Sequence, residues 1–160
     1  PQGIGKMKRY LFLLDVDGVM TTGQFIYSQA GKVYKVFGPH DSDGLKMLKD
    51  KVRIQFITAD KRGFPISKKR IVDDMGHELE LVSEYDRFDY VKEKYGFENL
   101  IYMGDGYFDA GILKESMLGI APNNARKEAK DAADYVTESN SGEGAVLDAC
   151  LTIIEKLELE

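Results

Sequence analysis

The chain has few of the cysteine and histidine residues that build a disulfide scaffold or a zinc site. Its 160 residues include one cysteine, Cys150, and two histidines. A single cysteine excludes an internal disulfide framework or a cysteine-based metal site. His40 and His77 are too far apart in the sequence to form a metal-binding motif. Cys150 follows Ala149 and precedes Leu151, which indicates a small core residue.

The sequence also lacks long apolar runs and an excess of positive charge. No run approaches the length of a membrane-spanning helix, and no signal-peptide pattern is present. The net charge of -5 argues against a general binder of nucleic acid or anionic membranes. We therefore expect a soluble, cytoplasmic protein with neither nucleic acid nor membrane as a partner.

The composition is that of an ordinary globular domain, with 43% hydrophobic and 31% charged residues. We find no internal repeat, low-complexity tract or linker, so we expect residues 1–160 to form a single domain. Residues 1–6 precede Met7 and are a candidate tag or linker. The sequence leaves open whether the chain is a whole protein or a domain excised from a larger one.

Short apolar runs alternate with amphipathic segments, which predicts an α/β fold with a parallel sheet and right-handed crossovers. Strands are expected at Tyr10–Leu14, Val52–Ile57, Glu80–Val82, Leu100–Met103, Leu118–Ile120 and Tyr135–Val136. Helices are expected at Ser42–Asp50, Pro65–Met75, Arg87–Tyr95, Phe108–Glu115, Ala125–Ala132 and Gly144–Leu157. One segment interrupts the alternation, because residues 24–28 and 32–37 read as a β-hairpin directly after the first strand.

The most informative motif is Asp15-Val16-Asp17-Gly18, which follows the first apolar strand. Ligands of parallel α/β sheets bind at the carboxyl ends of the strands. Because side chains alternate along a strand, Asp15 and Asp17 can face the same site while Val16 returns to the core. Two carboxylates there suit Mg²⁺, and one of them could attack phosphorus.

Polar residues follow three further strands in order. Thr58 ends the second strand and offers a hydroxyl beside a helix N-terminus, which suits phosphate oxygens. Arg87 opens the helix after the third strand and could neutralise nucleophile and phosphate together. Asp105 follows the fourth strand as a further carboxylate for Mg²⁺, and Asp109 could brace it or the waters of the metal.

Each motif also has a simpler interpretation. The Asp15 segment could be a calcium loop, but an EF-hand would need glycine at position 20 and glutamate at position 26, where the chain has Met20 and Ile26. Arg87 could form a surface ion pair with a neighbouring aspartate, and Lys92 or Lys94 could bind the phosphate in its place.

Together these motifs resemble those of the haloacid dehalogenase-like superfamily of phosphotransferases. The resemblance implies a three-layer, Rossmann-like fold with a parallel sheet. It also implies a phosphoric monoester hydrolase in which Asp15 is the nucleophile and Asp17 the general acid–base. Mg²⁺ would be held by Asp15, the backbone carbonyl of Asp17, and Asp105. Thr58 and Arg87 would position the phosphoryl group, although lysine is commoner than arginine at that place.

The chain is most similar to the capless branch of this superfamily typified by 3-deoxy-D-manno-octulosonate 8-phosphate phosphatase. That branch has a β-hairpin insert after the first motif, as expected here at residues 24–37, and no cap domain. Four subunits of such proteins join their hairpins, which implies a homotetramer here. A small phosphate ester, such as a sugar or sugar-acid phosphate, would be the substrate.

Two departures from the branch concern the substrate. Asp60 and Glu143 stand where the octulosonate phosphatase tends to have arginine. These carboxylates predict weak activity on octulosonate 8-phosphate and better activity on another phosphorylated sugar or longer sugar acid. His40 follows the hairpin and is a further candidate substrate contact.

Two other functions compete with a phosphatase. A signalling receiver domain would place its phosphorylated aspartate after the third strand, whereas here the acidic pair follows the first. A non-catalytic tetramerisation module of a nucleotide-sugar enzyme can lose catalytic carboxylates, whereas this chain retains them. The sequence does not identify the physiological substrate or pathway.

Overall fold

The computed structural model describes residues 8–159. The candidate tag or linker at residues 1–6 lies outside this range. Among the described residues, no helix is both long and apolar enough to cross a lipid bilayer.

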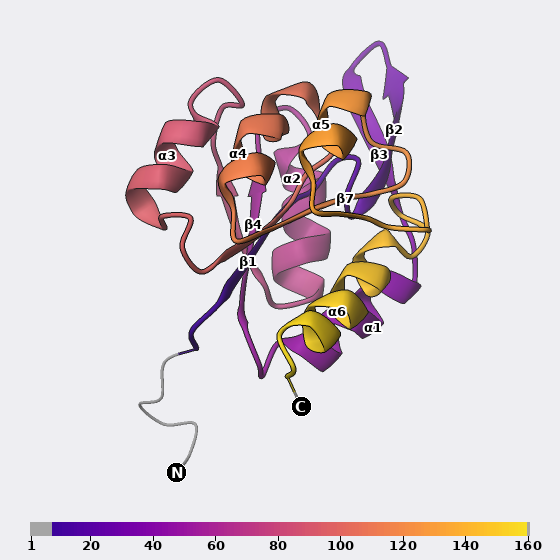
Figure 1. Cartoon of the computed structure of the whole chain (residues 1–160). Coiled ribbons are helices and arrows are strands. Elements are labelled where there is room, and N and C mark those ends of the chain that lie inside the picture. Colours follow the sequence, from indigo (N-terminus) through magenta and orange to yellow (C-terminus); the bar gives the residue numbers. More distant parts are fainter. Residues whose placement is uncertain (1–7, 160) are drawn as a thin grey trace.

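A six-stranded parallel sheet forms the centre of the molecule, with strand order β5-β4-β1-β6-β7-β8 (Figure 1). The strands are β1 (Leu11–Asp15), β4 (Arg53–Thr58), β5 (Glu78–Leu81), β6 (Leu100–Met103), β7 (Leu118–Ala121) and β8 (Tyr135–Val136). The chain extends the sheet from β1 through β4 to β5, then returns to the other side of β1 to build β6, β7 and β8. The carboxyl ends of β1 and β6 therefore flank the point where strand order reverses, which is where open α/β sheets bind ligands.

The alternation of side chains along β1 sends apolar groups to both faces of the sheet, as expected for a buried parallel strand. Phe12 and Leu14 contribute to one hydrophobic core, and Leu11 and Leu13 contribute to the other. The first core is covered by α1 (His40–Leu48), α6 (Ala145–Lys156) and η1 (Lys69–Asp74). The second is covered by α3 (Arg87–Lys94), α4 (Ala110–Glu115) and α5 (Lys127–Ala132).

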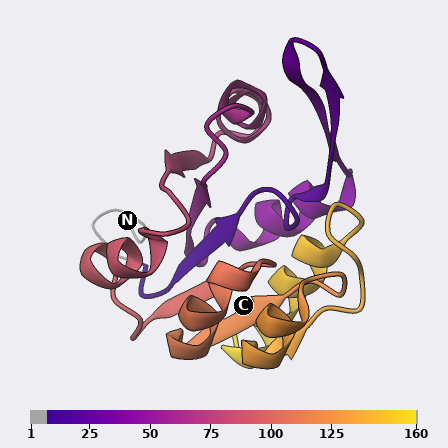
Figure 2. The same cartoon turned by 90° about the horizontal axis from the view of Figure 1, so that it is seen from above.

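The β-hairpin follows β1 directly and consists of β2 (Thr21–Ser28) and β3 (Gly31–Phe37), paired antiparallel. It projects away from the sheet rather than packing onto it (Figure 2). Its outer residues leave large apolar side chains exposed, among them Ile26 (56%) and Tyr34 (62%). The described chain contains no larger insert, so the expected three-layer, Rossmann-like α/β fold with a hairpin and no cap domain is confirmed.

Every expected strand and helix is present, with small shifts at the ends. The expected helix at 65–75 is divided into α2 (Phe64–Lys68) and the π-helix η1, where the amide of Met75 bonds the carbonyl of Arg70 five residues back. The helix expected from Phe108 starts instead as the 3₁₀ turn η2 (Tyr107–Asp109), which continues into α4. Helix periodicity alone does not distinguish these tighter or wider turns from α-helix.

Helices α1 and α6 approach closely at Gly44. A Cβ atom at this position would lie 2.9 Å from the Cα of Leu147 and 3.2 Å from the Sγ of Cys150. Cys150 is fully buried there, as a small core residue. The close contact between α1 and α6 thus depends on glycine at position 44, which has no side chain.

We predict that Gly44→Ala destabilises the protein by about 1–2 kcal/mol. Overpacking against the backbone of α6 costs about 1–3 kcal/mol, and the better helix propensity of alanine offsets up to about 1 kcal/mol. Urea denaturation measures the free energy of unfolding. The control Lys46→Ala changes an exposed position of the same helix and should alter stability by less than about 0.5 kcal/mol. Equal stability of the two variants would contradict the packing argument.

Candidate active site

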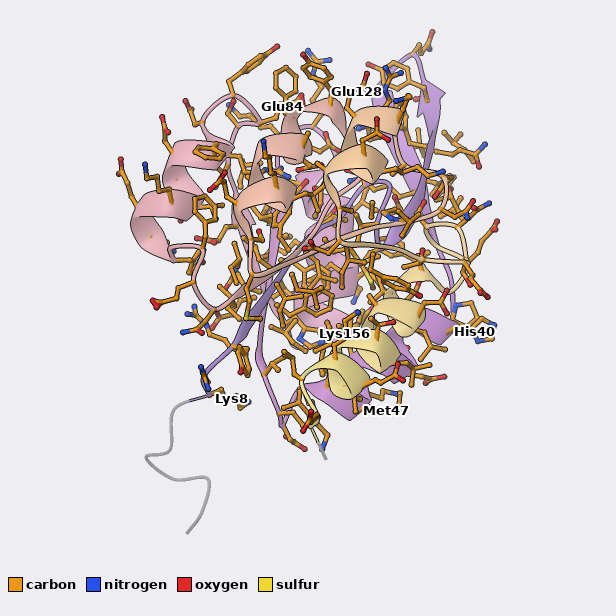
Figure 3. The ribbon with its side chains drawn as sticks, viewed as in Figure 1. Lys8, His40, Met47, Glu84, Glu128 and Lys156 are labelled. Atoms are coloured by element: carbon orange, nitrogen blue, oxygen red, sulfur yellow. The ribbon has the colours of Figure 1, made fainter. Side chains whose placement is uncertain are left out.

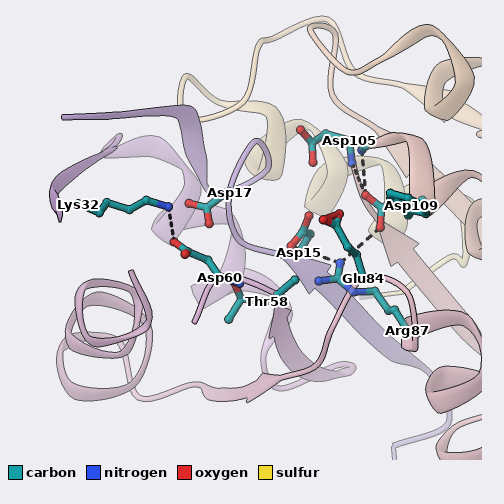
Figure 4. A pocket seen from close by; sticks show the side chains of 12 residues that line it. Asp15, Asp17, Lys32, Thr58, Asp60, Glu84, Arg87, Asp105 and Asp109 are labelled. Carbon is teal, nitrogen blue, oxygen red and sulfur yellow. Dashed lines mark hydrogen bonds and ion pairs between the residues drawn. The ribbon is translucent and has the colours of Figure 1, made fainter. Parts of the chain in front are cut away.

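A cavity of about 300 Å³ opens at the carboxyl ends of β1, β4 and β6. Its side chains form two groups, with Thr58 between them (Figure 4). Asp15, Arg87, Asp105 and Asp109 lie on one side, whereas Asp17, Lys32 and Asp60 lie on the other. The complete lining is Asp15, Asp17, Lys32, Thr58, Ala59, Asp60, Glu84, Arg87, Asp105, Gly106, Phe108 and Asp109.

The first group is a carboxylate cluster at the switch point of the sheet. One oxygen each from Asp15, Asp105 and Asp109 lies within 4.8 Å of the others. Asp109 is fixed because its Oδ2 accepts the backbone N–H groups of Asp105 (3.1 Å) and Gly106 (2.9 Å). Gly18 gives Asp105 its space, since a Cβ there would overlap the Asp105 carboxylate.

Arg87 is the cation of this cluster and is only 4% exposed. Its Nη1 lies 3.4 Å from Asp15 Oδ1 and 3.4 Å from Asp109 Oδ1, and it donates to the hydroxyl of Tyr102 at 3.1 Å. The Tyr102 hydroxyl donates in turn to Asp109 Oδ1 at 2.5 Å. Arg87 is therefore a buried part of the pocket and not a surface ion pair.

Thr58 is buried at the end of β4, with 1% of its surface exposed. Its hydroxyl oxygen accepts the backbone N–H of Asp60 at 3.1 Å. This bond leaves the hydroxyl hydrogen as a donor. Thr58 thus lies in the pocket with a hydrogen to offer a phosphate oxygen.

The second group joins Asp17 and Asp60 to two lysines of the hairpin. Lys35 Nζ lies 3.0 Å from Asp17 Oδ2 and 2.9 Å from Asp60 Oδ2. Lys32 Nζ lies 2.8 Å from Asp60 Oδ2. Burial raises the pKa of Asp60, but hydrogen bonds from Lys32 and Lys35 more than offset it and hold that pKa at about 2. Asp60 is therefore ionised and paired.

The carboxylate cluster holds more negative charge than Arg87 balances. Burial raises the pKa of Asp15 to about 7, against the lowering effect of Arg87. Burial, followed by the charges of Asp15 and Asp109, raises the pKa of Asp105 to about 8. Because the two carboxyls interact, they titrate as a pair. A divalent cation at this place would remove the repulsion.

The structure brings most of the expected site residues together, but not all. Asp15, Asp17, Thr58, Asp60, Arg87, Asp105 and Asp109 all line the cavity. His40 and Glu143 are exposed and do not line it. Figure 3 shows His40 at the start of α1, well separated from Glu84 at the cavity. Within this chain, these two residues are not placed to contact a substrate in the cavity.

Four residues near the site were not expected: Lys32, Lys35, Glu84 and Tyr102. Glu84 is an exposed acidic residue of the loop after β5, and exposed acids are common in loops. Tyr102 belongs to the apolar run of β6, where a tyrosine indicates only core packing. The two lysines of β3, Lys32 and Lys35, are three residues apart and would have suggested only a solvated hairpin. None of the four carries a motif of its own.

The chain is similar in sequence to known hydrolases. A family model described as haloacid dehalogenase-like hydrolase matches residues 89–149. The 3-deoxy-D-manno-octulosonate 8-phosphate phosphatase of Haemophilus influenzae is 32% identical over 146 residues, covering 88% of this chain and 80% of that protein. The chain belongs to the haloacid dehalogenase-like hydrolases.

Solved structures from this hydrolase family share the fold. The cobalt-bound octulosonate 8-phosphate phosphatase of Haemophilus influenzae aligns with a TM-score of 0.78 at 28% identity, covering 96% of this chain and 91% of that chain. The enzyme from Moraxella catarrhalis, in complex with magnesium ion, phosphate ion and KDO, aligns with a TM-score of 0.75 at 27% identity. This alignment covers 96% of this chain and 89% of that chain.

The residues of this hydrolase fit a magnesium ion. Asp15, Asp105 and Asp109 offer only carboxylate oxygens, the ligands that hard divalent cations prefer. The side chain of Asp17 is turned toward Lys35, so a contribution of Asp17 to the metal would come from its backbone carbonyl.

We predict that Mg²⁺ binding releases protons near neutral pH. With pKa values of about 7 and 8, Asp15 and Asp105 are partly protonated at pH 7 without metal. Ligand carboxylates must lose those protons, so Mg²⁺ affinity should rise as pH rises from 6 to 8. Isothermal titration calorimetry in buffers of different ionisation enthalpy measures the proton release.

The matched control for this experiment is Asp105→Asn. It removes one candidate ligand together with its titratable carboxyl, whose pKa is raised first by burial and then by neighbouring carboxylates, so both Mg²⁺ affinity and proton release should decrease. The paired carboxyl Asp60 serves as a second control, because Asp60→Asn should leave both quantities unchanged. Mg²⁺ affinity independent of pH between 6 and 8 would contradict the assignment.

Proposed function

We propose that this hydrolase is a Mg²⁺-dependent phosphatase that cleaves a small phosphate monoester, a sugar or sugar-acid phosphate, through an aspartyl-phosphate. The proposal rests mainly on the environment of Asp15. Its carboxylate ends β1 at the strand-order switch, faces a cavity, and lies between the guanidinium of Arg87 and the carboxylate of Asp105. The named relatives are phosphatases of a sugar-acid phosphate, which supports the same reaction class.

In the first step, an Asp15 carboxylate oxygen attacks phosphorus. The bond between phosphorus and the ester oxygen breaks, and its electron pair goes to the leaving alcohol. Asp17 donates a proton to that oxygen, which contributes on the order of 10²–10⁴-fold to rate. Thr58 and Arg87 would donate hydrogen bonds to the non-bridging oxygens of the phosphoryl group.

In the second step, water attacks the phosphorus of the aspartyl-phosphate. Asp17, now ionised, removes a proton from the water, and the bond to Asp15 breaks to release inorganic phosphate. Asp15, Asp105 and the carbonyl of Asp17 would hold Mg²⁺, with Asp109 beside them. When bound, the ion supplies charge neutralisation between nucleophile and phosphate.

The rim of the cavity bears on substrate choice. Asp60 is neutralised by Lys32 and Lys35, so it presents a hydrogen-bonding carboxylate rather than a free negative charge. Such a group suits hydroxyl or amino substituents of a sugar. Since arginine is typical of the octulosonate phosphatase at this place, we propose that octulosonate 8-phosphate is a poorer substrate than another phosphorylated sugar or a longer sugar acid.

A non-catalytic tetramerisation module is the second candidate. The exposed apolar hairpin favours assembly, but a module without catalysis would have no need of the buried cluster at Asp15. Arg87 and Tyr102 are arranged around that cluster, which favours catalysis. The described residues 8–159 include both the hairpin and the cavity.

The proposal predicts Mg²⁺-dependent release of phosphate in a screen of phosphorylated sugars and of eight- and nine-carbon sugar-acid phosphates. Chelation should abolish the activity and Mg²⁺ should restore it. Asp15→Asn removes the nucleophile and should lower kcat below detection, although the fold is kept. Glu84→Gln provides a matched control, because it changes an acidic group of the cavity wall that takes no part in the proposed steps.

Two outcomes would count against this function. The first is a wild-type protein that releases no phosphate from any member of the panel with Mg²⁺ present. The second is an Asp15→Asn variant that retains wild-type turnover. A tenfold preference in kcat/KM for octulosonate 8-phosphate, about 1.4 kcal/mol, would overturn the substrate proposal alone.

The hairpin supports a further part of the proposal, a homotetramer. Phe25, Ile26, Tyr27, Tyr34 and Val36 are between 44% and 62% exposed, on a two-stranded ribbon that projects away from the sheet (Figure 2). An isolated hairpin is marginally stable in water, and its open edges invite pairing. Pairing with identical hairpins would bury this surface.

We predict a mass of four times the chain mass of 18.0 kDa in light scattering at micromolar concentration. The double variant Ile26→Glu/Tyr34→Glu places charge on two cross-strand partners of the hairpin and should dissociate the assembly. Leu151→Glu is the matched control, because Leu151 is 49% exposed but lies on α6, away from the hairpin. A wild-type protein that remains monomeric would contradict the assembly.

A further inference from the structure

Lys35 combines three unusual properties. It lies on the exposed hairpin, between Tyr34 (62% exposed) and Val36 (44% exposed), yet its side chain is only 1% exposed. Its ammonium group contacts an oxygen of Asp17 (3.0 Å), of Asp60 (2.9 Å) and of the buried Ser67 (2.8 Å). An ammonium group has three N–H donors, and here each one has a partner.

The packing around this ammonium is close. A Cβ at Gly63 would overlap the Asp60 carboxylate and would lie 2.8 Å from both Lys32 Cδ and Lys35 Cε. Asp60 is fixed independently, because its Oδ1 accepts the N–H of Gly63 at 3.0 Å. The Lys35 ammonium is therefore bound to a rigid frame made by β4, α2 and the loop between them.

Asp17, in contrast, has few other restraints. Its Oδ2 bonds Lys35, and its Oδ1 accepts only a long hydrogen bond of 3.4 Å from Thr21. Its side chain is 33% exposed, compared with 16% for Asp60 and 14% for Asp15. The orientation of the Asp17 carboxylate thus depends mainly on Lys35.

We propose that Lys35 is a positioning residue that holds the Asp17 carboxylate in place for acid–base catalysis. This inference rests on the proposed phosphatase function. Lys35 acts through Asp17, so it does not contact the substrate. It also means that the hairpin takes part in the chemistry of its own subunit, in addition to any role in assembly.

A double-mutant cycle separates positioning from a structural role. Lys35→Met removes the ammonium and keeps the length of the side chain. Lys35→Gln is measured in parallel, because a polar side chain at this position should disturb folding less. Each is combined with Asp17→Asn. Turnover is measured with Mg²⁺ on p-nitrophenyl phosphate and on the best sugar phosphate of the panel.

Displacing a catalytic group by about 1 Å lowers the reaction rate on the order of 10²-fold. We expect this loss in kcat for Lys35→Met on the sugar phosphate, with KM unchanged. In the Asp17→Asn background, the same substitution should cause no further loss, since residues that act as a unit are non-additive. The control Lys68→Met removes an exposed lysine of α2 whose ammonium contacts Asp73 outside the cavity, and it should retain wild-type activity.

The readout that does not depend on activity is the crystal structure of Lys35→Met or Lys35→Gln. The Asp17 carboxylate should leave the place it occupies beside Lys35. The proposal is overturned if Asp17 remains there, or if Lys35→Met lowers kcat by the same factor in the wild-type background and in the Asp17→Asn background. A wild-type protein without activity would refute the proposed function, whereas the position of Asp17 would still test Lys35.

Discussion

The structure of the site depends on one constraint, the repulsion between carboxylates at the ends of β1 and β6. Three of them approach within 4.8 Å, and the one guanidinium among them, that of Arg87, balances only part of their charge. Burial first, and then the charges of the neighbouring carboxylates, raise the pKa of Asp15 and of Asp105. Burial, which would otherwise favour neutral carboxyls, is tolerated because a cation can complete the cluster. The same excess charge that destabilises the metal-free site is therefore what gives it affinity for Mg²⁺.

A second consequence is that the two aspartates of the first motif lie in different environments. Asp15 faces Asp105 and Arg87, whereas Asp17 faces Lys35. Carboxylates with separate partners can take separate roles, one as nucleophile and one as acid–base, without sharing a single proton between them. The separation requires a cation on the hairpin side of β1, which the lysines of β3 provide.

The sequence predicted the parts of this arrangement that follow from position along the chain. Strand alternation and the strand ends placed Asp15, Thr58, Arg87 and Asp105 at one edge, because parallel strands bring their carboxyl ends together. It did not predict Lys35 or Tyr102, since a lysine in a polar hairpin and a tyrosine in an apolar strand each have a commoner explanation. Two further candidates, His40 and Glu143, do not line the cavity within this chain. They follow motifs in the sequence, but α1 and the loop before α6 carry them away from the cavity.

The hairpin reaches the cavity and also exposes an apolar surface. One of its sides carries Lys35 into a buried frame at the cavity, while Ile26 and Tyr34 remain exposed. Because an ammonium bound to Asp17, Asp60 and Ser67 fixes β3 to α2 and the end of β4, the base of the hairpin is restrained even though its tip projects freely. The exposed apolar residues are consequently held at a defined angle to the sheet. A restrained base with an apolar outer surface would suit edge-to-edge pairing of identical hairpins, so the contacts of Lys35 that are proposed to orient Asp17 would also orient the surface proposed for assembly.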